Sequence, residues 1–214
     1  MFKPVVAVFL FALATGASAQ IVLGQVDTFQ DGTAQFWTGG GNIINQPTGG
    51  PAGAGDRFLS VESFGGVGGG SRLAMFNNTQ WSGDFQGAGV TAVSLHMRNL
   101  GQTDLQMRIV LFDFTNGDTR WTSTVAQPLL TGGGWQSMVF SVLEADLTRA
   151  QGSESYADLI VDVDRMMFRH QANAPAAEGD PIVATAGFDN IRAVPEPATF
   201  VALGLGALLL RRRK

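Results

Sequence analysis

Short segments in which every second residue is apolar, separated by glycine-rich stretches, fill the middle of this 214-residue chain. Val90–Arg98 alternates in this way, and Leu105–Phe114 does so with a second face that also becomes apolar toward its end. A period of two is that of a β-strand, whose successive side chains point to opposite faces. Both segments are therefore predicted to be strands, and the second is expected to be covered on both faces. The further predicted strands are Gln25–Phe29, Phe58–Glu62, Leu73–Phe76, Thr119–Val125, Trp135–Val142, Arg165–His170 and Gly187–Val194.

The connections between these segments favour antiparallel pairing. Asn116-Gly117 stands between two predicted strands and is a strong hairpin signal, because a tight two-residue turn needs positive φ at both positions. Val142–Ala150 is the one candidate helix, and it is short and weakly periodic. Eight or more short strands with glycine-rich turns predict an all-β antiparallel sandwich, and no fixed sequence period indicates a repeat architecture.

The N-terminus has the pattern of a secretory signal peptide. Lys3 supplies a positive charge, Val5–Ala14 is an apolar run, and small residues at Ala17 and Ala19 form a cleavage site. A permanent N-terminal anchor fits less well, because the apolar run is short and ends in small residues. Residues 1–19 are therefore predicted to be removed by signal peptidase, and the mature chain to begin at Gln20.

The C-terminus carries a second address. Pro195, Glu196 and Pro197 precede thirteen uncharged residues, 198–210, and the chain ends in Arg211, Arg212, Arg213 and Lys214. The basic end is expected to stay cytoplasmic. Thirteen helical residues span only about 20 Å, against about 30 Å for a hydrocarbon core. The segment 195–214 is therefore predicted to be a short hydrophobic helix that holds the protein at the membrane until an enzyme removes it.

This tripeptide, apolar stretch and basic end resemble the PEP-CTERM sorting tail of Gram-negative bacteria. The resemblance covers about twenty residues, with its three parts in the family's order. It implies an exosortase partner that recognises the tripeptide and removes the tail. It also implies a transient stay at the inner membrane, followed by the cell surface, outer envelope or extracellular matrix. The resemblance describes how the protein travels and leaves the activity of residues 20–194 open.

The segment between these two addresses is acidic. Residues 20–194 contain nine arginines, no lysine and seventeen aspartates or glutamates, which gives a net charge of about −8. This charge argues against binding to nucleic acid or anionic lipid, and the sequence shows no basic stripe. The chain has no cysteine, which excludes disulfides, thiolate catalysis and zinc–thiolate sites.

Three further motifs resemble galactose-binding-like jelly rolls, the fold of many carbohydrate-binding modules. They are Asp27–Gly32 with the following Phe36-Trp37, Gly134-Trp135-Gln136, and Phe188–Ile191. The resemblance implies a jelly-roll sandwich whose closing strand returns beside its first strand. It also implies a structural calcium ion bound by Asp27 and Asp189, although Gln30 stands where the family often has a glutamate.

A candidate glycan contact is Trp81, which lies in the polar segment Asn78–Asp84. An exposed indole can stack on the apolar face of a sugar while polar neighbours bind the hydroxyls. Trp37 and Trp135 are instead expected to fill the core. The leading interpretation is a non-catalytic surface or matrix protein whose sandwich binds extracellular polysaccharide or has a structural role.

The alternative is a secreted glycan-active hydrolase. Such an enzyme needs two carboxyl groups about 5–9.5 Å apart. Asp162 and Asp164 would share one face if their segment were a strand, and Glu144 and Glu62 are further candidates. The same residues fit the polar face of a half-buried strand. No Gly-x-Ser-x-Gly motif is present, and no catalytic residue is assigned.

Overall fold

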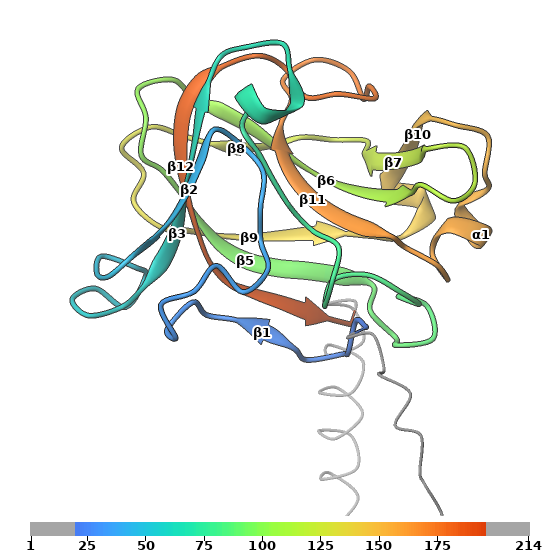
Figure 1. Cartoon of the computed structure of the whole chain (residues 1–214), viewed down its shortest axis with the longest axis horizontal. Helices are drawn as coiled ribbons and strands as arrows, with labels where there is room; N and C mark the ends of the chain where they lie inside the picture. Colours follow the sequence, from blue (N-terminus) through green and yellow to red (C-terminus); the bar gives the residue numbers. More distant parts are fainter. Residues whose placement is uncertain (1–19, 196–214) are drawn as a thin grey trace, which may run out of the picture.

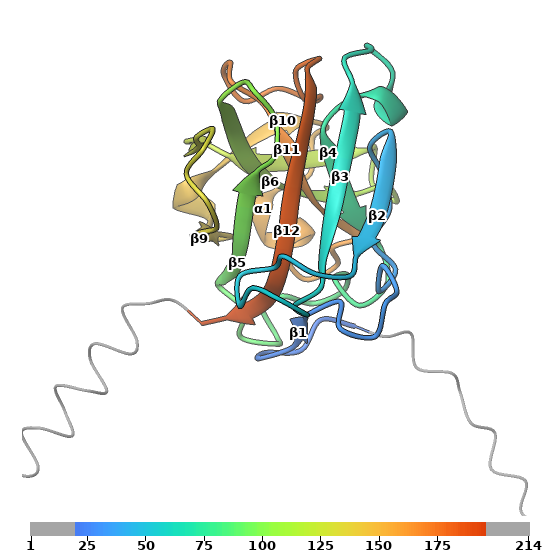
Figure 2. The same cartoon turned by 90° about the vertical axis from the view of Figure 1, so that its left-hand side faces the viewer.

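A computed structural model describes residues 20–195, which form two antiparallel sheets packed face to face. The first sheet, sheet A, has the strand order β2-β3-β12-β5-β9, with β1 beside β12, and Figure 2 shows it facing the viewer. Sheet B has the order β10-β7-β6-β11-β4, with β8 beside β6. Successive strands from β3 to β6 alternate between the two sheets, which gives the predicted jelly-roll sandwich (Figure 1).

Sheet A comprises β1 Val26–Asp27, β2 Asn42–Gln46, β3 Phe58–Phe64, β5 Ala92–Asn99, β9 Gln136–Ser141 and β12 Val183–Val194. Sheet B comprises β4 Ala74–Asn77, β6 Leu105–Asp113, β7 Thr119–Ser123, β8 Gln127–Leu129, β10 Leu147–Gln151 and β11 Arg165–His170.

Periodicity located nine strands, and it failed where a strand is short or exposed. Strand β11 has the predicted bounds, and β6 matches its prediction to within one residue. Strands β2, β8 and β10 were not predicted, because their exposed or partly exposed side chains carry little hydrophobic signal. The predicted helix at Val142–Ala150 is wrong: a 3₁₀ turn at Glu144–Asp146 leads directly into β10.

The hairpin between β6 and β7 forms as predicted, although the turn is longer than two residues. Asp113 pairs with Thr119 at the end of the ladder. Positive φ occurs at Gly117 (85°) and Asp118 (52°), one position later than expected. The carboxylate of Asp113 accepts the backbone N–H groups of Thr115 and Asn116, which closes the first half of the loop.

Strand β12 is the centre of sheet A and confirms the expected return of the closing strand beside the first. It pairs with β3 and β1 on one side and with β5 on the other, since Arg192 lies opposite both Val26 of β1 and Ser94 of β5. The register shifts after Asp189, where Asn190 adopts a positive φ of 52°. The chain's last described strand therefore joins both ends of the sandwich in one sheet.

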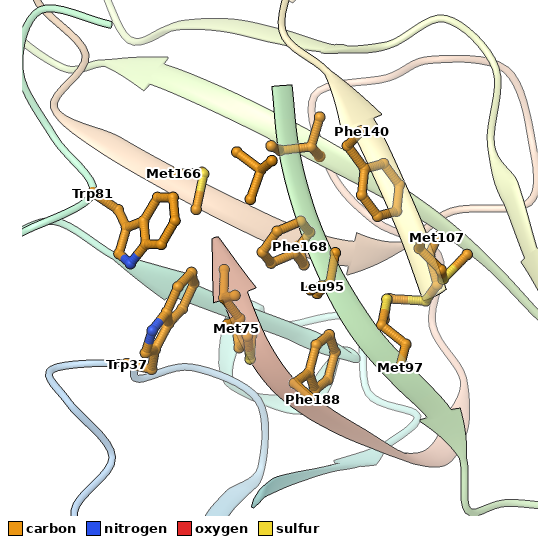
Figure 3. Close-up of a cluster of buried hydrophobic side chains, with 14 of the residues drawn as sticks. Trp37, Met75, Trp81, Leu95, Met97, Met107, Phe140, Met166, Phe168 and Phe188 are labelled. Atoms are coloured by element: carbon orange, nitrogen blue, oxygen red, sulfur yellow. The ribbon is translucent and has the colours of Figure 1, made fainter. Parts of the chain in front are cut away.

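The core between the sheets is rich in aromatic and methionine side chains (Figure 3). The Phe168 ring on β11 lies at its centre, with centroids 5.9 Å from Trp37, 5.4 Å from Phe140 and 6.3 Å from Phe188. Burying each such ring stabilises the fold by about 1.5–3 kcal/mol. Because these rings come from both sheets and from the loop before β2, the core fixes how the sheets face each other.

The predicted signal peptide and most of the predicted sorting tail lie outside the described residues. This applies to the signal peptide at 1–19, and to Glu196, Pro197 and the basic end of the tail. Within residues 20–195 no helix has the length and hydropathy needed to cross a membrane. The two ends of the described chain lie side by side, where the Gly24 N–H donates to the Ala193 carbonyl of β12 at 2.9 Å.

Candidate functional site

The outward side of sheet B carries a concentration of arginine and large apolar side chains. Because side chains alternate along each strand, Arg165, Met167 and Arg169 of β11 face outward while Met166 and Phe168 fill the core. The strand register sets Phe112 of β6 opposite Arg165, and it sets Arg120 of β7 opposite Phe112. Phe76 of β4 lies opposite Met167, and Ala74 lies opposite Arg169.

These residues surround a hollow of about 220 Å³. The loop 172–180 covers one side of it, and Arg72, which precedes β4, completes the rim. We call this surface the arginine face and define it by Arg72, Phe76, Phe112, Arg120, Arg165 and Arg169.

Two of these arginines hold the covering loop in place. Arg169 donates from Nη1 to the Ala177 carbonyl at 2.7 Å and from Nη2 to Gln171 Oε1 at 2.9 Å. Arg120 donates to the same Ala177 carbonyl at 2.8 Å and forms a two-pronged ion pair with Asp118. Arg120 and Arg169 therefore use some of their N–H donors to hold the loop in place.

Arg165 is bound differently, by aromatic rings instead of oxygen atoms. Its guanidinium carbon lies 3.9 Å from the centroid of Phe76, 4.5 Å from Phe114 and 5.7 Å from Phe112. Such cation–π contacts contribute about 0.5–2 kcal/mol. The ion pairs found in residues 20–195, Arg72–Glu178 and Arg120–Asp118, do not include Arg165.

The close packing of cations changes their acidity. Burial, and then the neighbouring cations Arg120, Arg108 and Arg72, lower the pKa of Arg169 to about 10. Burial lowers the pKa of Arg165, and the Arg120 cation adds to the effect. The face therefore gathers cations closely on an otherwise acidic domain.

The prediction that Trp81 is an exposed glycan contact is wrong. Trp81 is fully buried, and Figure 3 shows it in the core beside Trp37. Its Nε1 donates to Asp27 Oδ2 at 2.7 Å, and Trp37 Nε1 donates to the same oxygen at the same distance. The polar neighbours of Trp81 suggested exposure, but a buried carboxylate satisfies its one polar atom.

Trp135 also differs from its prediction, because it lies half-buried on the outward side of sheet A. Its ring packs edge-on against Phe58 at 5.1 Å, and its Nε1 donates to the Gly49 carbonyl at 2.9 Å. A Cβ at Gly187 would come within 2.8 Å of the indole, so glycine is needed beneath it. The prediction for Trp37 is confirmed, since it is 3% exposed.

Asp27 and Asp189 do not fit a calcium site. Asp27 Oδ2 accepts hydrogen bonds from the two indoles and from Gln80, whereas a calcium ion binds six to eight oxygen ligands. Asp189 lies opposite His96 on the outward side of sheet A, and both of its oxygens accept from Asn190. Within residues 20–195 no three His, Asp or Glu side chains gather into a metal-binding group.

The carboxylates proposed for hydrolysis are not brought together. Asp162 and Asp164 do not lie on one strand, because helix α1 (Tyr156–Leu159) and a turn occupy that segment. Asp162 is exposed, and Asp164 accepts the Phe114 N–H at the start of β11. Glu62 lies in sheet A, bound by the Asn42 amide, and Glu144 is exposed in the 3₁₀ turn.

One other carboxyl pair is coupled, at the β6–β7 turn. Burial, and then the adjacent Asp113 carboxylate, raise the pKa of Glu154 to about 7. The Asn116 amide bridges the two carboxyl groups, donating to Asp113 Oδ2 at 2.9 Å and to Glu154 Oε1 at 3.4 Å. The side chain of a turn residue occupies the space between the two carboxyl groups, where a glycosidase holds its sugar and water. This pair therefore closes a turn.

The arginine face is the feature that sequence reasoning missed. Its cations come from β7, β11 and the segment before β4, so no stretch of sequence has a basic character. One signal was available: Arg165 and Arg169 stand four residues apart on a predicted strand and therefore share a face. Only the sheet order adds Arg120 and Arg72 to that pair.

Comparison with known proteins identifies the tail and the fold. Residues 193–214 match the PEP-CTERM protein-sorting motif, which marks an exported protein that an exosortase sorts to the cell surface. No curated protein sequence matches the chain. The sorting route therefore rests on the C-terminal 22 residues.

Solved structures with the same fold are carbohydrate-binding modules and parts of agarases. A family 11 carbohydrate-binding module from Clostridium thermocellum, solved in complex with a β-1,3-1,4-mixed-linked tetrasaccharide, is 14% identical with a TM-score of 0.51. The match covers 81% of this chain and 97% of that module. An exo-β-agarase is 11% identical with a TM-score of 0.55, over 82% of this chain. The match spans only 25% of that agarase and 24% of a second agarase with a TM-score of 0.53. At these identities the likeness establishes the jelly-roll fold of carbohydrate-binding modules.

Proposed function

We propose that this chain is an exported, non-catalytic surface protein whose sandwich binds extracellular polysaccharide on the arginine face. The sorting motif supports export, and the N-terminal signal peptide agrees with it. The fold is one that carbohydrate-binding modules use. Neither fact alone identifies a ligand, and the proposal depends on the surface that the fold presents.

The observation that carries the proposal is the hollow on the outward side of sheet B. Pockets that enclose a whole small molecule measure about 300–1,000 Å³. The 220 Å³ hollow is smaller and open on a sheet surface, which suits one unit of a chain lying across the strands. Met167 and Ala74 give it an apolar floor, and the guanidinium groups of its rim supply hydrogen-bond donors. A sugar ring needs this combination of apolar surface and polar rim.

The distribution of carboxylates favours binding over hydrolysis. Glu62 lies on β3 and Glu144 in the 3₁₀ turn before β10, while Asp162 and Asp164 lie in the segment before β11. The Asp113–Glu154 pair is bridged by Asn116. The arginine face itself carries the carboxylates of Asp118 and Glu178, and each is engaged by an arginine. The proposal therefore assigns no catalytic residue.

The route of the protein is the second half of the proposal. Signal peptidase would act after Ala19, and an exosortase would act at the Pro195-Glu196-Pro197 motif after a transient stay at the inner membrane. The mature protein would then reach the cell surface, outer envelope or extracellular matrix of a Gram-negative cell. Replacing Glu196 with alanine should leave the tail uncleaved and the protein in the inner-membrane fraction. Unchanged processing of Glu196→Ala would refute the assignment of the exosortase.

Affinity electrophoresis of residues 20–194 through gels that contain single polysaccharides tests binding. The panel should hold neutral chains, such as mixed-linked β-glucan and agarose, and acidic chains, such as polygalacturonate and dextran sulfate. Met167→Trp fills the hollow, while Val139→Trp places the same indole on the outward side of sheet A, where Val139 is 43% exposed. Met167→Trp should abolish retention by whichever polysaccharide is bound, and Val139→Trp should leave it unchanged. Absence of retention by every polysaccharide, or equal effects of the two variants, would refute the proposal.

A further inference from the structure

The arginine face concentrates positive charge on a protein that is otherwise acidic. Five of the nine arginines in residues 20–194 face outward on sheet B or border that face: Arg72, Arg108, Arg120, Arg165 and Arg169. Against them stand Asp118 and Glu178 in direct ion pairs, and Asp164 and Asp180 nearby. A net charge of about −8 over the domain should repel polyanions, so this local gathering of cations is a specific feature.

Arg165 is held ready for a partner that the described chain does not supply. Stacking between Phe76 and Phe114 fixes the plane of the guanidinium and leaves its donor edge free of a carboxylate. Arginine stacked in this way presents a rigid fork of N–H groups that matches the two oxygens of a carboxylate or sulfate. The aromatic rings here support a cation, so they are not free platforms for a neutral sugar.

Unsatisfied donors mark the same surface. The Nε atoms of Arg72, Arg165 and Arg169 are buried and have no hydrogen-bond partner within residues 20–195. Arg169 is 2% exposed and lines the hollow, so its orphaned donor cannot turn to bulk water. Buried polar atoms are nearly always hydrogen-bonded, so these three unpaired donors reflect how closely the cations are packed on this surface.

The protein's own carboxylates show which acceptor the face takes. Arg120 grips Asp118 with two parallel bonds, Nε–Oδ1 at 3.2 Å and Nη2–Oδ2 at 2.8 Å. Arg72 contacts Glu178, whose side chain is 60% exposed on the covering loop. An incoming anion could replace Glu178 at Arg72 because that carboxylate is solvated and sits on a loop.

We propose that the arginine face binds polysaccharide chains that carry oxyanions, namely uronic acid carboxylates or sulfate esters, with Arg165 and Arg72 as the principal contacts. This inference rests on the proposed function, because it names the class of polysaccharide for the same face. The loop-binding duties of Arg120 and Arg169 explain why those two cations are present, but they do not explain Arg165.

The test compares three variants in the same gels. Arg165→Gln removes the charge at the stacked position, Arg165→Lys keeps the charge and removes the planar fork, and Arg192→Gln removes an exposed charge from sheet A. We expect Arg165→Gln to weaken retention by polygalacturonate or dextran sulfate at least about tenfold, because a hydrogen bond to a charged group is lost. The retention of Arg165→Lys should lie between that of the parent and that of Arg165→Gln. Arg192→Gln should be retained as strongly as the parent. Added salt should weaken the binding of the parent.

The outcomes separate the inference from the proposed function. Retention by polygalacturonate alone identifies carboxylate as the anion, and retention by dextran sulfate alone identifies sulfate. Either result supports the inference if Arg165→Gln abolishes the retention. Retention by neutral chains only, or acidic binding that survives Arg165→Gln, overturns it, and the proposed function stands if Met167→Trp still abolishes retention. Absence of retention on every polysaccharide overturns both. Thermal unfolding of each variant verifies folding, and Arg72→Gln gives a second reading if Arg165→Gln is unstable.

Discussion

Asp189 should make the protein less stable as the pH rises from about 4 to about 7, and replacing it with asparagine should remove that effect. The side chain is fully buried on the outward side of β12, opposite His96. Burial raises its pKa from 3.8 to about 7; the Asn190 N–H opposes the shift, and Asp56 adds to it. Asparagine has the same shape and keeps one oxygen as the acceptor for the Asn190 N–H, which is 2.7 Å away in the parent.

The size of the effect follows from the difference between the folded and unfolded pKa values. Below pH 3.8 the carboxyl is protonated in both states and carries no penalty. Between pH 3.8 and about 7 the folded state retains a proton that the unfolded state releases, so stability falls by about 1.4 kcal/mol per pH unit. Above pH 7 both states are ionised, and the folded state bears the whole cost, about 4 kcal/mol for three pKa units. Asp189→Asn should therefore be more stable than the parent by about 3–4 kcal/mol at pH 8, after about 1 kcal/mol for an altered hydrogen bond.

Urea unfolding of residues 20–194 at pH 4, 6 and 8 measures this difference directly. Asp189→Asn should be less stable than the parent by about 1 kcal/mol at pH 4, where only the altered hydrogen bond counts, and it should gain on the parent through pH 6 to pH 8. Taking the gap cancels the titration of Glu154, whose pKa of about 7 affects both proteins alike. A gap that does not change with pH, or a variant less stable than the parent at pH 8, would show that Asp189 is not ionised against a burial penalty.

Three further predictions concern the core, the metal and the outward side of sheet A. Asp27→Leu leaves two buried indole N–H groups without an acceptor, so it should destabilise the fold by about 2–6 kcal/mol. Chemical unfolding measures this loss, with Asp31→Leu at an exposed position as the control. Millimolar calcium, or its removal by a chelator, should leave the melting temperature unchanged, because Asp27 and Asp189 do not face each other; a shift of several degrees would reinstate the metal site. Gly187→Ala should destabilise the fold by about 1–3 kcal/mol, because the new Cβ would lie 2.8 Å from Trp135; a neutral result would mean that the indole moves freely.

The strands that sequence predicts best are those with one face in the core. In β11 the alternation of Met166 and Phe168 with Arg165, Met167 and Arg169 is complete, and the predicted bounds agree with the structure. Segments at the sheet edges, such as β2 and β10, bury less and carry no such pattern. The stretch before β11 has the pattern of a strand, because Val161 and Val163 alternate with Asp162 and Asp164 over four positions. A short helix ends just before it, capped by Ser155 through its bond to the Asp158 N–H.

The candidate site was less accessible from sequence than the fold. Trp81 lies among polar residues in the chain, and its burial depends on Asp27, which is 54 residues away. The arginine face has the opposite origin, since its cations are scattered in sequence and only the order of β4, β11, β6 and β7 assembles them. Composition gave the correct sign of the net charge of the domain. Because it averages over all residues, it did not reveal the local cluster of arginines. The proposed binding site is formed by residues that are distant in sequence, and the one local signal was the spacing of Arg165 and Arg169.

The most direct test of the account is to observe the arginine side chains while a ligand binds. Arginine Nε–H resonances of residues 20–194 can be followed by NMR during titration with oligogalacturonate, with sulfated dextran oligomers and with a mixed-linked β-glucan tetrasaccharide. The account predicts saturable shifts of Arg165 and Arg72 with an anionic oligomer, while Arg192 on sheet A does not respond. Shifts confined to Arg192 and its neighbours, or no shift with any of the three, would contradict the claim that this protein binds polysaccharide through the arginine face.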